Sequence, residues 1–164
     1  MDLNELARIE FLRRWASGSS WESGLAPDGT PVVRVRVDLE TWVTMRVSRE
    51  SEPAGAADAE FIAAAPGDVA RLAGALRGHF ELTEEPLAEI AARAAAASPP
   101  PWRLYLESDG GLGGPTIIQT EGDDRDLYLT LDGRQAPDDD WIFVAAAREA
   151  IPRLLAAISA GLRM

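Results

Sequence analysis

One phrase occurs twice in this chain, and the repeat limits the folds that the chain can adopt. Residues 59–76 read AEFIAAAPGDVARLAGAL, and residues 141–158 read WIFVAAAREAIPRLLAAI. At an offset of 82, Phe61 aligns with Phe143, and the apolar residues that follow recur at i, i+3, i+4, i+7 and i+11 in both segments. That spacing is typical of an amphipathic helix. Both segments are therefore predicted to be helical and to bury the same face.

The repeat extends upstream of the phrase. Residues 6–21, LARIEFLRRWASGSSW, align with residues 87–102, LAEIAARAAAASPPPW, at an offset of 81. This alignment places Trp21 on Trp102, and one residue of slippage in the intervening strands and turns reconciles the two offsets. We therefore predict that the chain is a tandem duplication.

Each copy, 1–82 and 83–164, is predicted to contain a helix, a short antiparallel sheet and a second helix. In the first copy, residues 31–37 and 41–47 alternate apolar and polar side chains, as half-buried strands do. The second copy has three strand-like segments, 102–107, 116–120 and 127–131. Turn sequences such as EGDDRD separate them, which favours hairpins.

Prolines are predicted to divide each repeated phrase into a short helix and a longer one. Proline is accepted in the first turn of a helix but costs about 3 kcal/mol in its interior, so Pro152 and Pro66 indicate interruptions. Asp68 is then a suitable N-cap for the second helix of the first copy. Segments 51–58 and 132–140 are predicted to be loops.

The predicted fold class is α+β, with two pseudo-equivalent copies that share one core. Neither copy of about 80 residues is richly apolar, and small domains bury too little surface to be stable alone. A pseudo-twofold axis within the chain would then imitate a homodimer. The expected state is a monomer with this internal symmetry or a weak homodimer.

The order of these motifs resembles the small Ead-type domain of temperate phages and actinobacteria. The second copy carries the opening ASPPPW at 97–102 and the closing FVAAAREAIPRLL at 143–155, and the first carries AEFIAAAPGDVARL at 59–72. The first copy departs from the pattern with SGSSW before its Trp, and Ala70 stands where the helix proline would be. The resemblance implies only a fold and a phage-like or actinobacterial setting, because no biochemical activity is established for the family.

Residues that carry common enzyme or metal chemistry are scarce. The chain has no cysteine and one histidine, His79, which we interpret as a favourable residue at a helix C-terminus. The glycines of DGGLGGP, 109–115, lack the Lys-Ser/Thr of a phosphate loop and precede a strand, so they indicate a hairpin. The acidic segments 123–126 and 137–140 lack the spacing of a calcium loop. No catalytic residue, metal or cofactor is predicted.

The net charge of −11 restricts the partners that we expect. Nucleic acids and anionic membranes attract clustered lysine and arginine, so neither is predicted as a partner. The sequence also lacks a stretch of about 18 apolar residues and a secretory leader, which favours a cytoplasmic location. A basic protein is the predicted partner.

Two features are predicted to contact that partner. Segment 121–140 contains eight acids, and those predicted to bind are Asp123, Asp124, Asp126, Asp138, Asp139 and Asp140. The last three of these also suit the start of a helix. Trp42 alternates along its strand on the side of Arg46, where Arg34 and Arg36 can also point, and helix packing on that face is an equal alternative.

The sequence thus favours a non-enzymatic, acidic protein-binding module that neutralises a basic partner in an immunity, anti-defence or phage–host role. One alternative is a structural or accessory component that assembles through helix faces or Trp42. The other is a metal-dependent hydrolase built on the acidic loops. Salt dependence separates the first two, because screening weakens charge pairing far more than apolar contact.

Overall fold

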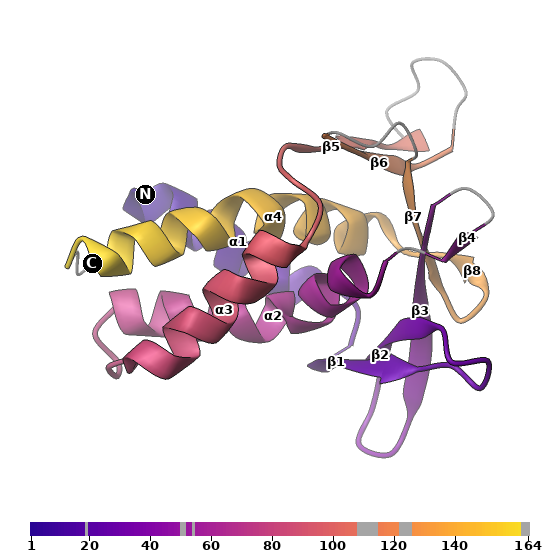
Figure 1. Ribbon diagram of the computed structural model, residues 1–164, viewed down its shortest axis with the longest axis horizontal. Helices are drawn as coiled ribbons and strands as arrows, with labels where there is room; N and C mark the ends of the chain where they lie inside the picture. The colour runs from indigo at the N-terminus through magenta and orange to yellow at the C-terminus, as the bar shows by residue number, and fades with distance from the viewer. Residues whose placement is uncertain (19, 50–51, 54, 108–114, 122–125, 162–164) are drawn as a thin grey trace.

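A computed structural model shows an α+β protein in which helices lie on one side and strands on the other (Figure 1). The described residues are 1–18, 20–49, 52–53, 55–107, 115–121 and 126–161. Four helices are found in them: α1 (Leu3–Trp15), α2 (Ala56–Leu76), α3 (Glu84–Ala96) and α4 (Asp138–Ser159). A capping box begins α1, in which the Asp2 carboxylate accepts from the Glu5 backbone and the Glu5 carboxylate accepts from the Asp2 backbone.

The predicted antiparallel pairing is confirmed, but the strands of the two halves form one sheet instead of a separate short sheet in each copy. They are β1 (Ser20–Leu25), β2 (Pro31–Arg36), β3 (Trp42–Arg49), β4 (Glu52–Pro53), β5 (Trp102–Tyr105), β6 (Ile117–Thr120), β7 (Leu127–Leu131) and β8 (Arg134–Gln135). The order across the sheet is β1-β2-β3-β7-β6-β5, with β4 beside β3 and β8 beside β7. The short strands β4 and β8 lie in segments that the sequence predicted as loops, because two residues are too few for an alternation pattern to show.

The two halves of the chain meet along β3 and β7 at the centre of the sheet. Val47 pairs with Leu129, and these two residues are separated by the same offset of 82 that relates the repeated phrases. Met45 pairs with Leu131 on one side of them and Arg49 with Leu127 on the other. A single cluster of buried side chains contains residues of both halves, so the halves share one hydrophobic core.

The predicted division of each repeated phrase into two helices is wrong. Pro66 lies inside α2 and Pro152 lies inside α4, and both helices continue through them. An interior proline costs about 3 kcal/mol, whereas burial of one large apolar side chain contributes about 1.5–3 kcal/mol. Each helix buries several such side chains along its length, among them Phe61 and Leu72 in α2, so burial outweighs the local preference.

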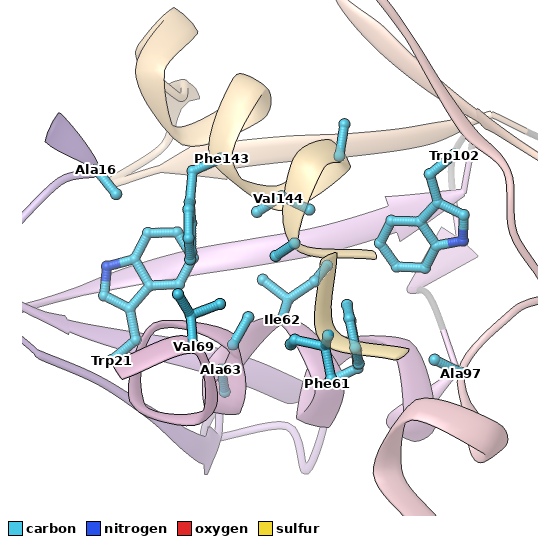
Figure 2. Close-up of a cluster of buried hydrophobic side chains, with 14 of the residues drawn as sticks. Ala16, Trp21, Phe61, Ile62, Ala63, Val69, Ala97, Trp102, Phe143 and Val144 are labelled. Atoms are coloured by element: carbon cyan, nitrogen blue, oxygen red, sulfur yellow. The ribbon is translucent and has the colours of Figure 1, made fainter. Parts of the chain in front are cut away.

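The core is centred on aromatic pairs that join the halves. Trp21 packs edge-on against Phe143 with ring centroids 5.8 Å apart, and Phe61 packs edge-on against Trp102 at 5.6 Å. Figure 2 shows the two tryptophans at opposite ends of the cluster, with Ile62 and other side chains of α2 and α4 between them. Edge-to-face contact suits the quadrupoles of the rings and fixes the angle between the elements that carry them.

Candidate functional site

The structure separates the acidic residues that the sequence placed together. Asp123 and Asp124 lie outside the described residues. Asp126 is half-buried just before β7, and α4 begins with Asp138, half-buried, and Asp139, exposed. The predicted helix start is confirmed, and carboxylates there interact favourably with the helix dipole.

Asp140 lies inside the protein and is therefore not part of the acidic surface. Its exposed fraction is 0%, and its two carboxylate oxygens accept hydrogen bonds from Ser17, from the backbone N–H at 2.5 Å and from the hydroxyl at 2.7 Å. Burial raises the pKa of Asp140, and the hydrogen bonds from Ser17 partly oppose that effect. The side chain closes the end of α1 and offers nothing to a partner.

The same arrangement occurs at the end of α3. Asp58 accepts from the Ser98 backbone N–H at 2.7 Å and from its hydroxyl at 2.9 Å. In both places the serine backbone carbonyl also accepts from an indole N–H four residues later, Trp21 at 2.7 Å and Trp102 at 3.1 Å. Each aspartate belongs to the opposite half of the chain from the serine that it holds.

Gly18, which follows the first of these serines, is required by the geometry. Its φ is +68°, a conformation that side chains with Cβ rarely adopt. A Cβ atom there would also overlap the backbone carbonyl of Arg36 in β2. The glycine therefore lets the chain turn from α1 into the sheet while Ser17 stays bound to Asp140.

Two buried arginines distinguish the Ser98 site from the Ser17 site. Arg49 donates to Asp58 at 3.0 Å, to the Ser98 hydroxyl at 2.8 Å and to the Thr120 hydroxyl at 3.0 Å. Arg148 donates to the Ser98 carbonyl at 3.0 Å and lies over the rings of Phe61 and Trp102.

The Ser17 site has no counterpart to these arginines. When the halves are aligned at the offset of 82, Leu131 corresponds to Arg49 and Pro66 corresponds to Arg148. Burial lowers the pKa of Arg148, and the neighbouring Asp58 opposes that shift. Local sequence patterns do not predict this cluster, although Asp58 and Asp140 occupy matching places just before the repeated phrases.

Trp42 lies among arginines, as the strand alternation predicted. The guanidinium carbon of Arg34 is 5.0 Å from the ring centroid and that of Arg36 is 5.8 Å from it. Trp42 pairs with Arg36 across β3 and β2 and is half-buried. The arginines therefore cover part of the indole by cation–π contact, which leaves only the rest of it open to a partner.

The described residues contain no group of three or more metal-ligating side chains. In the same part of the chain, no helix has the length and apolar character needed to cross a membrane. Asp68, predicted to cap a helix, instead lies buried inside α2 and accepts from the half-buried Arg93 at 2.8 and 3.2 Å.

Comparison with known proteins does not add a family to this description. No protein-family model, no curated protein and no solved structure matches the chain. The resemblance to Ead-type domains stays a prediction from the motifs, and the contacts described above are what a functional assignment rests on.

Proposed function

We propose that this protein is a non-enzymatic binding module whose acidic surface engages a basic protein partner. The observation that carries the proposal is the net charge of −11 on a fold whose buried ionic groups are engaged in structural contacts. Such a charge favours a basic partner by long-range attraction and speeds encounter at low salt. An immunity, anti-defence or phage–host role suits this chemistry.

The proposed contact residues are the acidic side chains of the second half that reach the surface near β7 and the start of α4. Asp139 and Asp132 are exposed, and Asp126 is half-buried at the other end of β7 from Asp132. Charge at the rim of an interface changes association rate and salt dependence more than it changes packing. These three residues are therefore a better test than a set that includes the buried Asp140.

We expect the variant Asp126→Asn/Asp132→Asn/Asp139→Asn to lose the partner. Tagged protein would be used to capture proteins from the native host at about 50 mM and about 300 mM salt, followed by mass spectrometry. A specific basic protein should be captured by the original protein at low salt, be released at high salt, and be reduced about tenfold or more with the variant.

The matched control removes the same number of charges from the first half. Glu22, Glu40 and Glu60 are exposed there, and replacing each with Gln removes three negative charges, as the Asp variant does. Capture that survives in this control and falls in the Asp variant locates the surface. Equal loss in both variants would show that only total charge matters, and unchanged capture in both would overturn the proposal.

A second candidate, a component that assembles through a helix face, is favoured by the outer surface of α1. Leu3, Phe11 and Trp15 are 57%, 58% and 62% exposed, and the rings of Phe11 and Trp15 are 5.9 Å apart. Phe11 and Trp15 are four residues apart on the side of the helix away from the buried Leu6 and Ile9, and Leu3 lies at the edge of that side, three residues before Leu6. The matching residues of α3 are Glu84, Ala92 and Ala96, so this apolar stripe belongs to the first half alone.

Removing the α1 stripe should abolish association if this candidate holds. We expect Phe11→Ser/Trp15→Ser to remain monomeric at concentrations where the original protein associates, with little difference between low and high salt, because apolar contact is weakly screened. Light scattering after size-exclusion chromatography measures the mass. The control is Ala92→Ser/Ala96→Ser on α3, and a monomeric original protein at all concentrations would contradict self-assembly.

We also propose that the two halves are copies of one unit related by a pseudo-twofold axis through the pair Val47 and Leu129. The repeated sequence supports this, as does the register, in which Met45 pairs with Leu131 and Leu127 pairs with Arg49. The exchanged Ser–Asp contacts are arranged as they would be between subunits of a symmetric dimer.

A further inference from the structure

A cavity of about 360 Å³ opens between α1, α4 and β5. Its walls are mainly apolar and include Ile9, Leu12, Trp102, Leu104, Ile142 and Ala150. Its charged residues are Glu5, Arg8, Glu149 and Arg153. Ligand pockets typically have volumes of about 300–1,000 Å³, so this cavity is at the lower end of that range. If each water-sized group occupies about 30 Å³, the cavity has room for roughly a dozen non-hydrogen atoms.

The corresponding place in the other half holds an ion pair. Leu12 matches Arg93 at the offset of 81, and Ala150 matches Asp68 at the offset of 82. Arg93 donates to both carboxylate oxygens of Asp68, and the Asp68 side chain is only 5% exposed. The contact between α2 and α3 is therefore closed by a bidentate pair, whereas between α1 and α4 two uncharged side chains stand in the same places and line an open cavity.

The charged side chains that line the cavity are two carboxylates and two guanidiniums. Glu5 is engaged by Arg153 at 2.5 Å and by the Asp2 backbone N–H at 2.9 Å. A guanidinium has five N–H donors, so Arg153 retains donors after this contact. Arg8 is exposed, and within the described part of the chain it makes no hydrogen bond or ion pair. Because Glu5 pairs with Arg153, the other two charged side chains of the cavity are Arg8 and the carboxylate of Glu149.

We propose that this cavity binds a small carboxylic acid with an apolar tail or ring. The apolar part lies against Leu12, Ile142 and Trp102, where its transfer from water is favourable. The carboxylate is bound by Arg8, because a planar guanidinium matches a carboxylate with two parallel hydrogen bonds. Neither contact uses the side chain of Asp126, Asp132 or Asp139.

Octanoate is the probe for this site, measured by isothermal titration calorimetry on the intact protein. We expect saturable binding of one octanoate per chain, and binding of octylamine that is at least about tenfold weaker, because the charged hydrogen bonds to Arg8 are lost. Octanoate that does not bind, or octylamine that binds as well or better, would overturn the proposal.

Two variants connect the binding to the cavity. Leu12→Arg/Ala150→Asp copies the Arg93–Asp68 pair of the other half into the cavity and should reduce octanoate affinity at least about tenfold. Ala150→Leu fills the space without charge and should also weaken binding, which keeps the test valid if the double variant does not fold. Unchanged affinity in a folded variant of either kind would contradict the site.

The carboxylate contact is tested separately. Arg8→Gln should weaken octanoate binding about tenfold and leave octanol binding unchanged, since only the acid uses the guanidinium. The control is Arg14→Gln, which removes a second exposed arginine of α1 that does not line this cavity. Equal weakening by both substitutions would indicate general charge attraction and would overturn the assignment of Arg8.

Discussion

Replacing Asp58 with Ala should lower the free energy of unfolding by about 3–5 kcal/mol. The Arg49 and Asp58 side chains are 5% and 6% exposed, so the substitution removes a buried carboxylate that is paired with a buried guanidinium. It also removes the acceptor for the backbone N–H and hydroxyl of Ser98, which ends the connection between α3 and α2 at that point. Urea denaturation followed by circular dichroism measures the loss.

A double variant identifies the cause of that loss. In Asp58→Ala/Arg49→Met both members of the buried ion pair are replaced, so we expect part of the stability to return relative to Asp58→Ala alone. As a control, Arg77→Ala breaks the more exposed ion pair of Arg77 with Glu10 at 2.5 Å and should cost less than about 1 kcal/mol. A similarly small cost for Asp58→Ala would contradict its buried role.

Replacing Trp102 with Ala should cost about 3–5 kcal/mol, through lost transfer free energy and the cavity that remains. Trp102 is 4% exposed and packs against Phe61. Its indole N–H donates to the Ser98 carbonyl, so the substitution also affects the serine that Asp58 holds. Thermal or urea unfolding gives the magnitude.

The matched variant Trp102→Phe separates packing from hydrogen bonding. A phenyl ring preserves most of the contact with Phe61 and removes the donor to Ser98, so a smaller loss than for Ala is expected. A Phe variant as unstable as the Ala variant would mean that the hydrogen bond dominates. Little loss in either variant would contradict the placement of Trp102 in the shared core.

Local patterns predicted β2 and β3 because buried and more exposed side chains alternate along part of each strand. Val33 and Val35 are buried in β2 while Arg34 between them is exposed, which is the alternation that the sequence displays. The strands β4 and β8 were not predictable in this way, since their two residues each are placed by pairing with β3 and β7.

Tertiary burial explains the helices that were predicted wrongly. Pro66 and Pro152 indicated breaks by a rule that considers only the local backbone. In the folded protein Val69 and Ile151, close to these prolines, are fully buried. The helices continue through the prolines because the apolar side chains before and after each proline are buried in the same core. Energies from distant contacts are not visible in a local window.

The acidic run shows a similar limit for the candidate site. Asp138, Asp139 and Asp140 are identical in sequence chemistry, yet the last is buried and holds Ser17. Comparison between halves was the available signal: Asp140 matches Asp58, whereas Asp138 and Asp139 match alanines. Because an aspartate and a serine recur at matching places in both halves, a structural contact between them is a simpler explanation than partner binding.

The exchanged Ser–Asp contacts also determine the order in which the chain can fold during synthesis. Ser17 and Asp140 are separated by 123 residues, and at ribosomal speeds of about 5–20 residues per second the serine waits roughly 6–25 s for its acceptor. Over most of that time the edge of β3 that receives β7 is open to strands of other nascent chains. Closure of the sheet and of the α1 end is therefore a late event, and the interval before it is when the protein is most exposed to misassembly with its neighbours.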